Sequence, residues 1–576
     1  MVPRNFRVPA LALVAMVMVA VSASVYAAPP LPAASFEWTT VVNNNDTMPE
    51  APSNRKFNSY NQPSVNAAGR VVIRARSTGG GGMPATHGIY TRDMSLGDGP
   101  ENPIVKILDR TTEVPYPNNS GTKFVETPSF PRIDMGSDTI ATRGNHQPMW
   151  FISEEAAYDG AYGTTGIYAN PFGTLITGAS KIGVLAEFGF FEVPGAPAGT
   201  PFDVFPGAPS VTNGSTIVFK GNYTVDGAGK TGVFYRDLKD AVAGGTSPVM
   251  LIANNTGTVI PGSKSTIFGS TSPPSAAGQL AVFAGFDNEQ SPTLGGLYMV
   301  DLRKPQTLKR LVGIGAKVPG GTRTDTFNRL GEAVAFDGRY VGFWGAWGTE
   351  TRTVTLKCPT EGNKDRRAYC NRNLICYENG SPTDVTAKDP DSTCDGTDCY
   401  QKKKVPVHQG VFLYDTEAQT LWVVAKTGDA FNDFVFWNYS GKPPCTGMMG
   451  HGQEGAEDDG EPARWRSSSF VAVSNGSTAF KASSADRSGI YLNICSNPAK
   501  CSLVTVLDTI MDGTNLDTEY APPAGDISKI RELGLEREGL RGDWLAINAR
   551  MGVEGGTEED GMAGVYVTRV PITSPR

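Results

Sequence analysis

The sequence is poor in charged residues and in histidine. Only 19% of its 576 residues are Asp, Glu, Lys or Arg, and only four are His. The Ala, Leu, Glu and Lys excess typical of helical proteins is missing. The net charge is −7, no run of Lys and Arg is long enough to follow a phosphate backbone, and no local basic patch is visible. These features exclude nucleic acid as an expected partner.

The common motifs of nucleophilic and metal-dependent catalysis are also missing. There is no Gly-x-Ser-x-Gly, no His-Glu-x-x-His and no Cys-x-x-Cys pair. Four glycines at 79–82 lack a following Lys-Ser or Lys-Thr, so they do not predict a phosphate-binding loop. The acidic loop from Glu454 to Glu461 offers oxygen ligands for calcium without the alternating spacing of a known calcium loop. We therefore expect a solvated charge run there, and neither a metal nor a cofactor.

One apolar stretch approaches the length of a membrane-spanning segment, and it lies at the start of the chain. Arg4 and Arg7 precede the apolar residues 8–22, and small residues typical of a cleavage site end at Ala27. Residues 1–27 are therefore predicted to be a secretory signal, with an uncleaved anchor as the alternative. We expect the mature chain to have no transmembrane segment. Its predicted location is secreted, at the cell surface, or periplasmic in a bacterium.

No cysteine occurs before residue 358, and all eight lie between Cys358 and Cys501. In an exported chain this usage predicts disulfides. Cys495 and Cys501 flank a Pro-containing turn, and we predict a disulfide between them. The other six are expected to pair among themselves, around a Cys-rich loop insertion at residues 348–407, with no pairing favoured. They are Cys358, Cys370, Cys376, Cys394, Cys399 and Cys445.

Eight Asn-x-Ser/Thr sequons mark positions where an exported chain is glycosylated if its host has the machinery. The asparagines are Asn45, Asn118, Asn213, Asn222, Asn254, Asn379, Asn438 and Asn475.

Glycine and proline are abundant, at 67 and 41 residues, and aromatic residues make up 9% of the chain. Glycine and proline interrupt helices, whereas β-branched and aromatic residues favour strands. The composition predicts an all-β, turn-rich protein. A motif of Gly, a branched aliphatic residue and then Tyr or Phe occurs seven times, at spacings of 64–114 residues. The copies begin at Gly88, Gly166, Gly232, Gly296, Gly410, Gly489 and Gly564.

A second repeated piece with strand-like alternation precedes each copy, for example at residues 63–73 and 209–219. Its Asn-Gly or Asp-Gly centre suits a tight hairpin turn, and an apolar run follows each copy of the first motif. Each unit therefore predicts four short strands. Seven units predict a seven-bladed β-propeller over residues 28–570, with 571–576 as a tail. The longest spacing leaves an eighth blade open, but the polar insertion at 348–407 accounts for it better.

A ring of blades must close on itself. The last motif copy is followed by too few residues for a further strand, whereas the segment from Phe36 to Val42 is a lone strand-like piece before the first unit. We expect this segment to serve as the outer strand of the last blade, which removes two open sheet edges.

The repeated units resemble a family of exported tandem-repeat proteins. In that family N-x-x-G-x-V-x-F is followed by G-[IV]-[YF]. Asn66-Ala67-Ala68-Gly69 and then Gly88-Ile89-Tyr90 match the pattern, while Asp134-Met135-Gly136 and Arg541-Gly542 are degraded copies. The resemblance spans nearly the whole mature chain. It implies a β-propeller and export, and it carries no catalytic residues to transfer.

The long segments of the predicted propeller emerge on one face, called here the loop face. The tight turns between first and second strands and between third and fourth strands emerge on the other, the turn face. Loops on a rigid scaffold are where binding residues concentrate, so we expect the ligand on the loop face. The alternative is that long loops simply contain more residues of every kind. All histidines and half of the tryptophans map there, with Trp150 and Trp437 expected outside strands: His87, His146, His408, His451, Trp150, Trp347, Trp437 and Trp465.

Two functions fit these features. The first is a non-catalytic exported recognition or scaffold protein that binds an extracellular carbohydrate or protein through aromatic side chains. The second is a polysaccharide lyase that acts on an acidic polymer by β-elimination. Such a lyase needs a base, an acid and a carboxylate-neutralising group, and His146, Tyr158 or Tyr162, and Arg143 supply these by type. We favour the first, because the chain is acidic and no catalytic motif is present.

Overall fold

The computed structural model describes residues 31–572 except for fourteen short stretches. The stretches left out are 52–53, 79–84, 120, 148, 152–159, 163, 361–362, 379–380, 397, 445–461, 485, 498–499, 524–525 and 554–560. The side chains of residues 149–151, 160–162, 377–378, 381–385 and 496–497 are not described either. The predicted signal at 1–27 therefore lies outside the described residues.

The chain is all-β, as its composition predicts. Within the described residues, seven antiparallel sheets have four or more strands and are numbered here in chain order. Sheet 1 has β2 (Phe57–Tyr60), β3 (Ser64–Val65), β4 (Arg70–Ser77), β5 (His87–Asp93) and β6 (Val105–Asp109). Sheet 2 has β7 (Phe124–Glu126), β8 (Arg132–Ile133), β9 (Ile140–His146), β12 (Thr165–Ala169) and β13 (Ile176–Ser180). Sheet 3 has β14 (Ser210–Thr212), β15 (Thr216–Val225), β16 (Ala228–Asp237) and β17 (Met250–Asn254).

The remaining large sheets follow the same plan. Sheet 4 has β18 (Ser270–Thr271), β19 (Ser275–Ala277), β20 (Leu280–Phe286), β21 (Gly295–Asp301) and β22 (Leu308–Gly313). Sheet 5 has β23 (Phe327–Leu330), β24 (Ala335–Phe336), β25 (Tyr340–Lys357), β28 (Thr393–Asp395), β29 (Asp398–Asp415) and β30 (Thr420–Lys426). Sheet 6 has β33 (Val471–Ser474), β34 (Ser477–Ser484), β35 (Arg487–Asn497) and β36 (Lys500–Asp508). Sheet 7 has β37 (Ser528–Gly534), β38 (Leu540–Arg541), β39 (Trp544–Val553), β40 (Met562–Arg569) and β1 (Thr39–Asn43).

Three two-stranded hairpins and one α-helix complete the described elements outside short 3-10 turns. They are β10 (Met149–Phe151) with β11 (Gly160–Tyr162), β26 (Leu374–Glu378) with β27 (Ser381–Ala387), β31 (Phe436–Ser440) with β32 (Arg464–Ser468), and α1 (Lys364–Cys370). No helix among the described residues combines the length and the apolar character needed to cross a bilayer.

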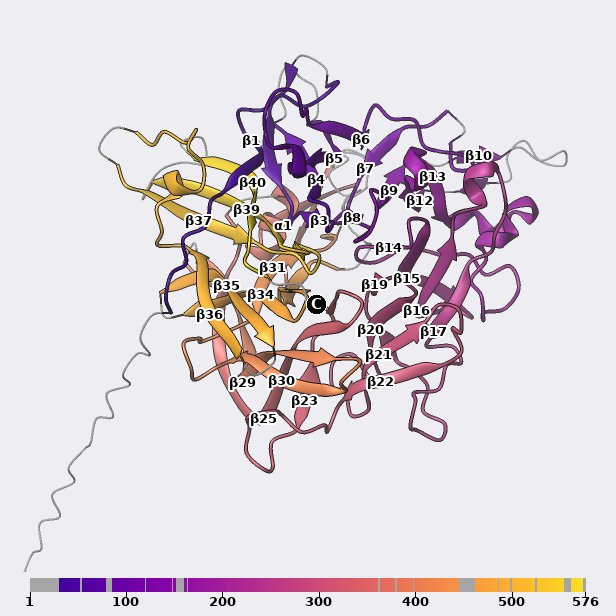
Figure 1. Ribbon diagram of the computed structural model, residues 1–576. Helices are drawn as coiled ribbons and strands as arrows, with labels where there is room; N and C mark the ends of the chain where they lie inside the picture. The colour runs from indigo at the N-terminus through magenta and orange to yellow at the C-terminus, as the bar shows by residue number, and fades with distance from the viewer. Residues whose placement is uncertain are drawn as a thin grey trace, which may run out of the picture.

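The sheets are arranged around a common centre in chain order, which is the architecture of a β-propeller (Figure 1). The innermost strands contact one another in the order β3, β8, β14, β19, β24, β33 and β38, and β38 contacts β3. A hydrophobic cluster fills each junction between consecutive sheets, and one fills the junction between sheets 7 and 1. The core is therefore divided among the junctions.

The Gly-aliphatic-aromatic motif lies on the third strand of every sheet, and the structure gives its physical reason. At each copy the pairing register with the outer strand shifts at the aliphatic and aromatic residues. This bulge brings an outer-strand carbonyl oxygen over the glycine, where an added Cβ would lie only 2.0–2.9 Å from it. The motif requires glycine because no side chain fits beneath that oxygen.

A phenylalanine repeat that sequence analysis missed supports the motif aromatics in six sheets. In each, a ring from the segment entering the sheet packs edge-on against the motif ring, at centroid distances of 4.8–5.2 Å. Sheet 7 differs, because Tyr566 donates a hydrogen bond of 2.8 Å to Asp517. The entering phenylalanines are Phe57, Phe124, Phe202, Phe268, Phe327 and Phe431.

A charged segment of sheet 7, residues 536–541, ties the centre of the molecule together. Glu538 accepts hydrogen bonds from Val65 N through its carbonyl and from Ser210 Oγ through its carboxylate. Arg541 donates to the carbonyl oxygens of Phe336 and Val473. Glu536 contacts Arg132 of sheet 2, and Arg537 donates to the carbonyl oxygen of Pro273 in sheet 4. With these contacts the segment touches all six other sheets.

The ionic part of this centre is the pair of Arg132 and Glu536, whose charged atoms lie 3.0 Å apart. Burial raises the pKa of Glu536, but the nearby charges of Arg132 and Arg537 outweigh burial and hold that pKa below its ordinary value. Burial lowers the pKa of Arg537 to about 10. A buried carboxylate remains ionised here because two cations face it.

The disulfide between Cys495 and Cys501 is confirmed. The structure also pairs Cys358 with Cys370 and Cys394 with Cys399, and Cys376 is disulfide-bonded as well. Cys445 lies outside the described residues.

The region expected as a loop insertion at 348–407 is partly strand. β25 and β29 continue as a pair as far as Lys357 and Tyr400, so only the segment between these two residues interrupts the ribbon. The prediction of a loop was wrong at both ends because the polar Thr-rich and Lys-rich sequences there still alternate between two faces.

Two predicted glycosylation sites are buried in the folded chain. Asn118 is fully buried and donates through Nδ2 to the hydroxyl of Tyr168 over 3.2 Å, and Asn254 is 1% exposed. A glycan on either asparagine would displace internal contacts.

Candidate functional site

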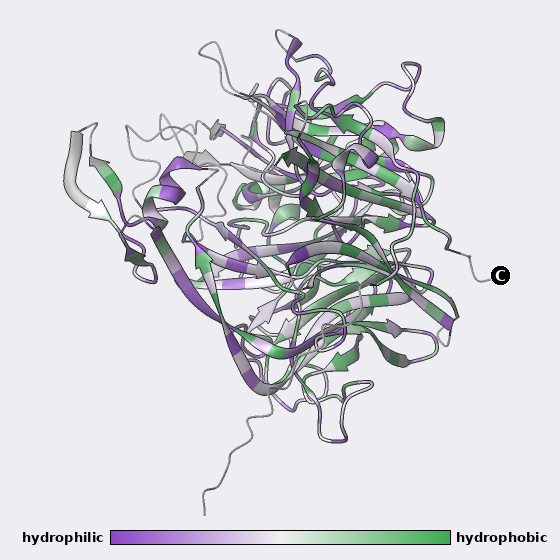
Figure 2. Ribbon diagram, turned by 90° about the vertical axis from the view of Figure 1, so that its left-hand side faces the viewer, coloured by the Kyte–Doolittle hydropathy of each residue, from purple (hydrophilic) through white to green (hydrophobic). Residues whose placement is uncertain are grey.

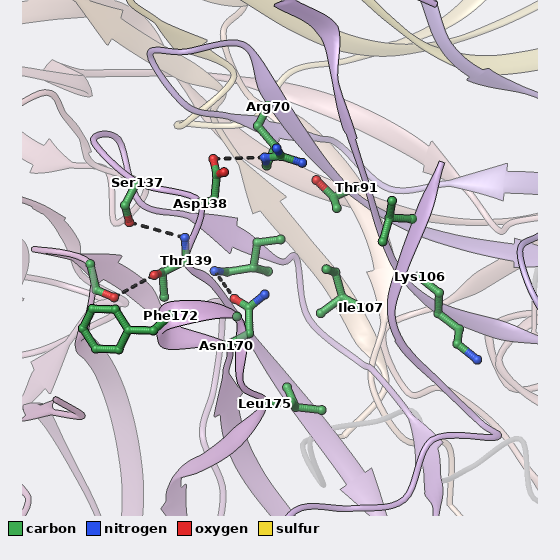
Figure 3. Close-up of a pocket in the computed structure, with 14 residues that line it drawn as sticks. Arg70, Thr91, Lys106, Ile107, Ser137, Asp138, Thr139, Asn170, Phe172 and Leu175 are labelled. Atoms are coloured by element: carbon green, nitrogen blue, oxygen red, sulfur yellow. Dashed lines mark hydrogen bonds and ion pairs between the residues drawn. The ribbon is translucent and has the colours of Figure 1, made fainter. Parts of the chain in front are cut away.

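A groove of about 620 Å³ lies on the turn face between sheets 1 and 2 (Figure 3). Sheet 1 contributes Arg70 at the start of β4, Thr91 of β5 and residues 105–107 of β6. Sheet 2 contributes its two tight turns, at residues 137–140 and within 170–175. The groove therefore lies on the face opposite to the one on which the sequence places the candidate binding residues.

An ion-pair network connects the two sheets at this groove. Arg70 Nη2 lies 3.1 Å from Asp93 Oδ2 within sheet 1, and Arg70 Nε lies 3.0 Å from Asp138 Oδ1 in sheet 2. Asn66 donates through Nδ2 to the same Asp138 oxygen over 3.1 Å. The side chain of Asp138 is 63% exposed, whereas that of Arg70 is 24% exposed. The groove thus presents an accessible carboxylate beside a guanidinium that internal contacts hold in place.

Phe172 stands at the edge of the groove, beside Thr139 (Figure 3). Its side chain is 68% exposed, and its backbone has φ of 55° and ψ of 26°. This left-handed conformation is unusual for a bulky residue, and such strain is concentrated at functional sites. The tight turn Asn170-Pro171-Phe172-Gly173 imposes it, since Gly173 N donates to the carbonyl oxygen of Asn170 over 3.0 Å. The turn therefore holds an aromatic ring out in solvent.

This combination has a definite binding chemistry. An exposed aromatic face packs against the apolar C–H face of a sugar ring, while charged and amide groups beside it form hydrogen bonds with sugar hydroxyls. Phe172 supplies the ring, and Asp138 and Arg70 supply charged hydrogen-bonding groups. Among the described residues, no set of three or more His, Cys, Asp or Glu side chains is placed to hold a metal ion.

On the loop face, the predicted residue His87 is buried in an ionic cluster between sheets 1 and 2. Its Nε2 lies 3.4 Å from Glu126 Oε2, and the side chain is 8% exposed. Glu126 also faces Arg74 Nη2 at 2.5 Å and Arg76 Nη2 at 3.5 Å. The structure thus uses this histidine to join two sheets, and Glu126 is a partner that the sequence alone does not reveal.

The lyase residues do not converge in the described structure. His146 and Arg143 both lie on β9, which pairs with β12 without a bulge. Residues three apart on a regular strand point to opposite faces of the sheet, so these two side chains face different neighbours. Tyr158 lies outside the described residues, and of Tyr162 only the backbone, in β11, is described.

His146 itself is buried at the junction between sheets 1 and 2. Its Nδ1 lies 2.6 Å from the carbonyl oxygen of Gln147, and Nε2 has no hydrogen-bond partner among the described residues. Burial lowers the pKa of His146 below the usual 6.5, and the contact with Gln147 opposes this in part. The imidazole is therefore held in its neutral form with Nδ1 as the donor.

Trp347 and His408 form a stacked pair on the loop face. Their rings are 6.0 Å apart and inclined by 22°, and they lie opposite each other on β25 and β29. Trp347 is only 6% exposed and packs in the core of its junction, whereas the side chain of His408 is 46% exposed and lies 3.6 Å from Glu350. Only the histidine of this pair is accessible.

Trp437 and Trp465 lie on strands β31 and β32, so the expectation that Trp437 lies outside a strand was wrong. Trp465 packs edge-on against Tyr439 at 5.5 Å, within a cluster that includes the disulfide of Cys358 and Cys370. The strand pairing sets Tyr439 directly opposite Trp465, so the two rings share one face of the hairpin. That face stabilises the Cys-rich region.

The other loop-face expectations are only partly described. Trp150 lies on strand β10, against the expectation that it lies outside a strand, and its side chain is not described. His451 and the acidic loop from Glu454 to Glu461 lie outside the described residues.

Sequence reasoning missed the groove. Its one local signal is Phe172 between Pro171 and Gly173, because a large aromatic residue in a two-residue turn has no strand face on which to be buried. Arg70 and Asp138 carry no such signal, because their proximity depends on the packing of two sheets.

No protein-family model and no curated protein sequence matches this chain. Among solved structures, the chain is similar to the β-propeller domain of the Trilobed protease from Pyrococcus furiosus, at 8% identity over 89% of this chain and 94% of that one, with a TM-score of 0.37. It is also similar to Pyrococcus horikoshii acylaminoacyl peptidase, at 8% identity over 86% of this chain and 50% of that one, with a TM-score of 0.36. A third likeness is to Pseudomonas aeruginosa periplasmic gluconolactonase, at 10% identity over 78% and 95% of the two chains, with a TM-score of 0.23. These likenesses are too distant to bear on function.

Proposed function

We propose that this chain is an exported, seven-bladed β-propeller that recognises carbohydrate without turning it over. Its ligand binds, in this proposal, in the groove between sheets 1 and 2. The observation that carries the proposal is the exposed ring of Phe172, held in a left-handed turn beside the pair of Arg70 and Asp138.

The closed ring of seven blades is supported by the way β1 joins sheet 7. β1 pairs antiparallel with β40, and Val42 O lies over Gly564 as an outer-strand carbonyl lies over each other motif glycine. The paired strand spans Thr39–Asn43, which is shifted toward the C-terminus from the expected segment at 36–42. The cluster between sheets 7 and 1 contains residues of both ends of the chain, so the two ends stabilise each other.

Export is supported by the basic and apolar start of the chain together with the disulfides, which persist in oxidising compartments. We therefore place the protein outside the cytoplasm, either extracellular or periplasmic.

The test is a glycan array probed with the mature chain, followed by binding measurements on the best glycan with two alanine variants. Phe172→Ala should weaken binding by roughly tenfold or more, the loss expected for an aromatic anchor at the centre of a contact. Tyr116→Ala is the matched control, since Tyr116 is 71% exposed and lies in the crossover between sheets 1 and 2. It should bind like the parent.

Each other outcome has a clear meaning. A loss with Tyr116→Ala alone would move the site to the loop face. Release of unsaturated sugar ends from a polyuronate, abolished by His146→Ala, would replace recognition with lyase activity. Binding to no glycan while a protein partner is captured through Phe172 would keep the groove and reject the carbohydrate.

A further inference from the structure

A two-stranded ribbon extends from sheet 5 beyond its strands β23 and β30. It consists of residues 351–357 of β25 paired with residues 400–406 of β29, and we call it the arm. The strands β25 and β29 are each 18 residues long, whereas β23 pairs with β25 only as far as Trp347. Figure 2 shows these strands leaving the body toward the helix α1, coloured mostly as hydrophilic residues.

One face of the arm is covered by the Cys-rich region and its neighbours. Gln401 donates through Nε2 to Asp389 Oδ2 over 2.8 Å, and Lys403 Nζ lies 3.2 Å from Asp391 Oδ2. Arg352, on the same face, forms an ion pair with Asp433. The basic residues of this face are therefore neutralised.

The opposite face of the arm is open and cationic. Residues that pair directly across an antiparallel ribbon share a face, so Lys402 lies beside Thr355 and Lys404 beside Thr353. All four of these side chains are exposed. Lys357 and Tyr400 form the next pair on this face, and the ammonium of Lys402 lies 5.8 Å from the centre of the Tyr400 ring.

Carboxylates on this face lie at the tip of the arm, where Asp395 pairs with Asp398, and Lys402 and Lys404 lie further along the ribbon. Lys357 lies 3.6 Å from Asp398, but both side chains are more than two-thirds exposed, so the attraction is weak. Among the described residues, neither Lys402 nor Lys404 has a carboxylate within ion-pair distance. A chain of net charge −7 thus carries a locally cationic strip.

We propose that this face of the arm binds an acidic polysaccharide. The positive charge of this face is complementary to the negative charge of such a polymer. The side chains of Lys402 and Lys404 start about 7 Å apart, the spacing of alternate residues on a strand. A ribbon with charges at regular intervals suits an extended, regularly charged polymer. The hydroxyl groups of Thr353 and Thr355 lie directly across from the two lysines, where they can donate hydrogen bonds to sugar oxygens. This surface is on sheet 5, so the proposal does not depend on the groove between sheets 1 and 2.

The experiment measures binding of the mature chain to immobilised polygalacturonate, with neutral dextran as the uncharged control. The double variant K402E/K404E should lose roughly tenfold or more in affinity at low salt, as two exposed charge contacts are reversed. Parent binding should weaken steeply when sodium chloride is raised from roughly 20 to roughly 200 mM. Dextran should not bind through the arm.

The matched control is K403Q, because Lys403 lies in the same run of three lysines but faces the covered side. It should bind polygalacturonate like the parent. A loss with K403Q equal to that of the double variant would overturn the assignment to one strand face. No binding by the parent, or equal binding of single-stranded DNA and of anionic lipid vesicles, would overturn the acidic polysaccharide as the ligand. Circular dichroism of each variant confirms that the fold is intact.

Discussion

Two neighbouring junctions of the propeller are built from equivalent positions but differ in what fills them. Trp544 of sheet 7 and Arg70 of sheet 1 occupy equivalent positions on the second strand of their sheets. Each lies three residues before the residue that pairs with the motif tyrosine of its sheet. Trp544 covers Gly69 of the next sheet, where an added Cβ would lie 2.5 Å from its ring, and it packs under the guanidinium of Arg569 at 3.7 Å. Arg70 instead forms an ion pair with Asp138 of the next sheet, and a groove remains beside it.

The junction that Trp544 fills also has the larger hydrophobic core. The cluster between sheets 7 and 1 has fourteen buried residues, whereas the cluster between sheets 1 and 2 has eight. The second junction replaces apolar contacts with the buried cluster of Glu126, Arg74 and His87 toward the loop face. Equivalent positions of one repeated scaffold thus hold an apolar ring at a closed junction and an ion pair beside a groove at the next.

The largest effect expected from this comparison is at the filled junction. Trp544 is 6% exposed, so Trp544→Ala should lower the free energy of unfolding by about 4 kcal/mol, the usual cost of removing a buried aromatic ring. Arg70→Ala at the equivalent position should cost less than about 1 kcal/mol, because its ion pairs are partly exposed. Urea denaturation of both variants measures the difference, and equal losses would show that the junctions are energetically alike.

The next effect concerns the ionic cluster of the groove junction. Glu126→Gln should lower the free energy of unfolding by about 3 kcal/mol, because the buried guanidinium of Arg74 would then lose the carboxylate that faces it. Glu417→Gln is the control, since this carboxylate is 67% exposed in its pair with Arg339. A Glu126 variant as stable as the control would mean that the cluster is not needed to join sheets 1 and 2.

Converting one junction into the other tests the groove directly. Arg70→Trp places an indole where Trp544 stands in the equivalent junction, and we expect it to fill the groove. Carbohydrate binding should fall by roughly tenfold or more, while the melting temperature stays at or above that of the parent. Binding that survives in a correctly folded Arg70→Trp variant would separate the ligand site from the groove.

The smallest expected effect is a pH dependence confined to the groove junction. Because burial lowers the pKa of His146 below 6.5, the folded state binds this proton less readily than the unfolded state. The stability from neutral His146 is therefore fully present above about pH 6.5 and is lost progressively as the pH falls below it. His146→Gln should flatten the stability profile between about pH 5 and 7.

Much of the fold was predictable because the repeated motif has a local cause. Gly88 and its six counterparts sit beneath outer-strand carbonyls, so each copy marks a third strand wherever it occurs. The disulfide of Cys495 and Cys501 was predictable for a similar reason, since the two are only six positions apart across a turn. The strand extensions around residues 349–357 and 398–407 were missed because their alternation involves threonine and lysine instead of apolar residues.

The candidate sites were less predictable, because loop length and residue type do not report exposure. Trp347 and Trp465 lie in the long loop-face segments that we expected to bind a ligand, yet both side chains pack against neighbouring residues. Phe172 lies in a short turn whose one local signal is an aromatic residue between proline and glycine, and it is exposed. The lysines at 402 and 404 look like part of one polar run until strand pairing separates them from Lys403.

The repeat, its tight turns and most of its strands are encoded in local sequence patterns. These follow from the glycines, aromatic residues and alternating apolar residues of each unit, whose constraints act over a few neighbours along the chain. Which sides of the strands meet depends on how the sheets pack against one another. Arg70 and Asp138 are 68 positions apart, and Glu126 faces His87 of another sheet, so their chemistry exists only after two sheets have packed together. The groove and the cationic face of the arm depend on the packing of sheets and the pairing of strands, which bring side chains together across distances that local sequence patterns do not encode.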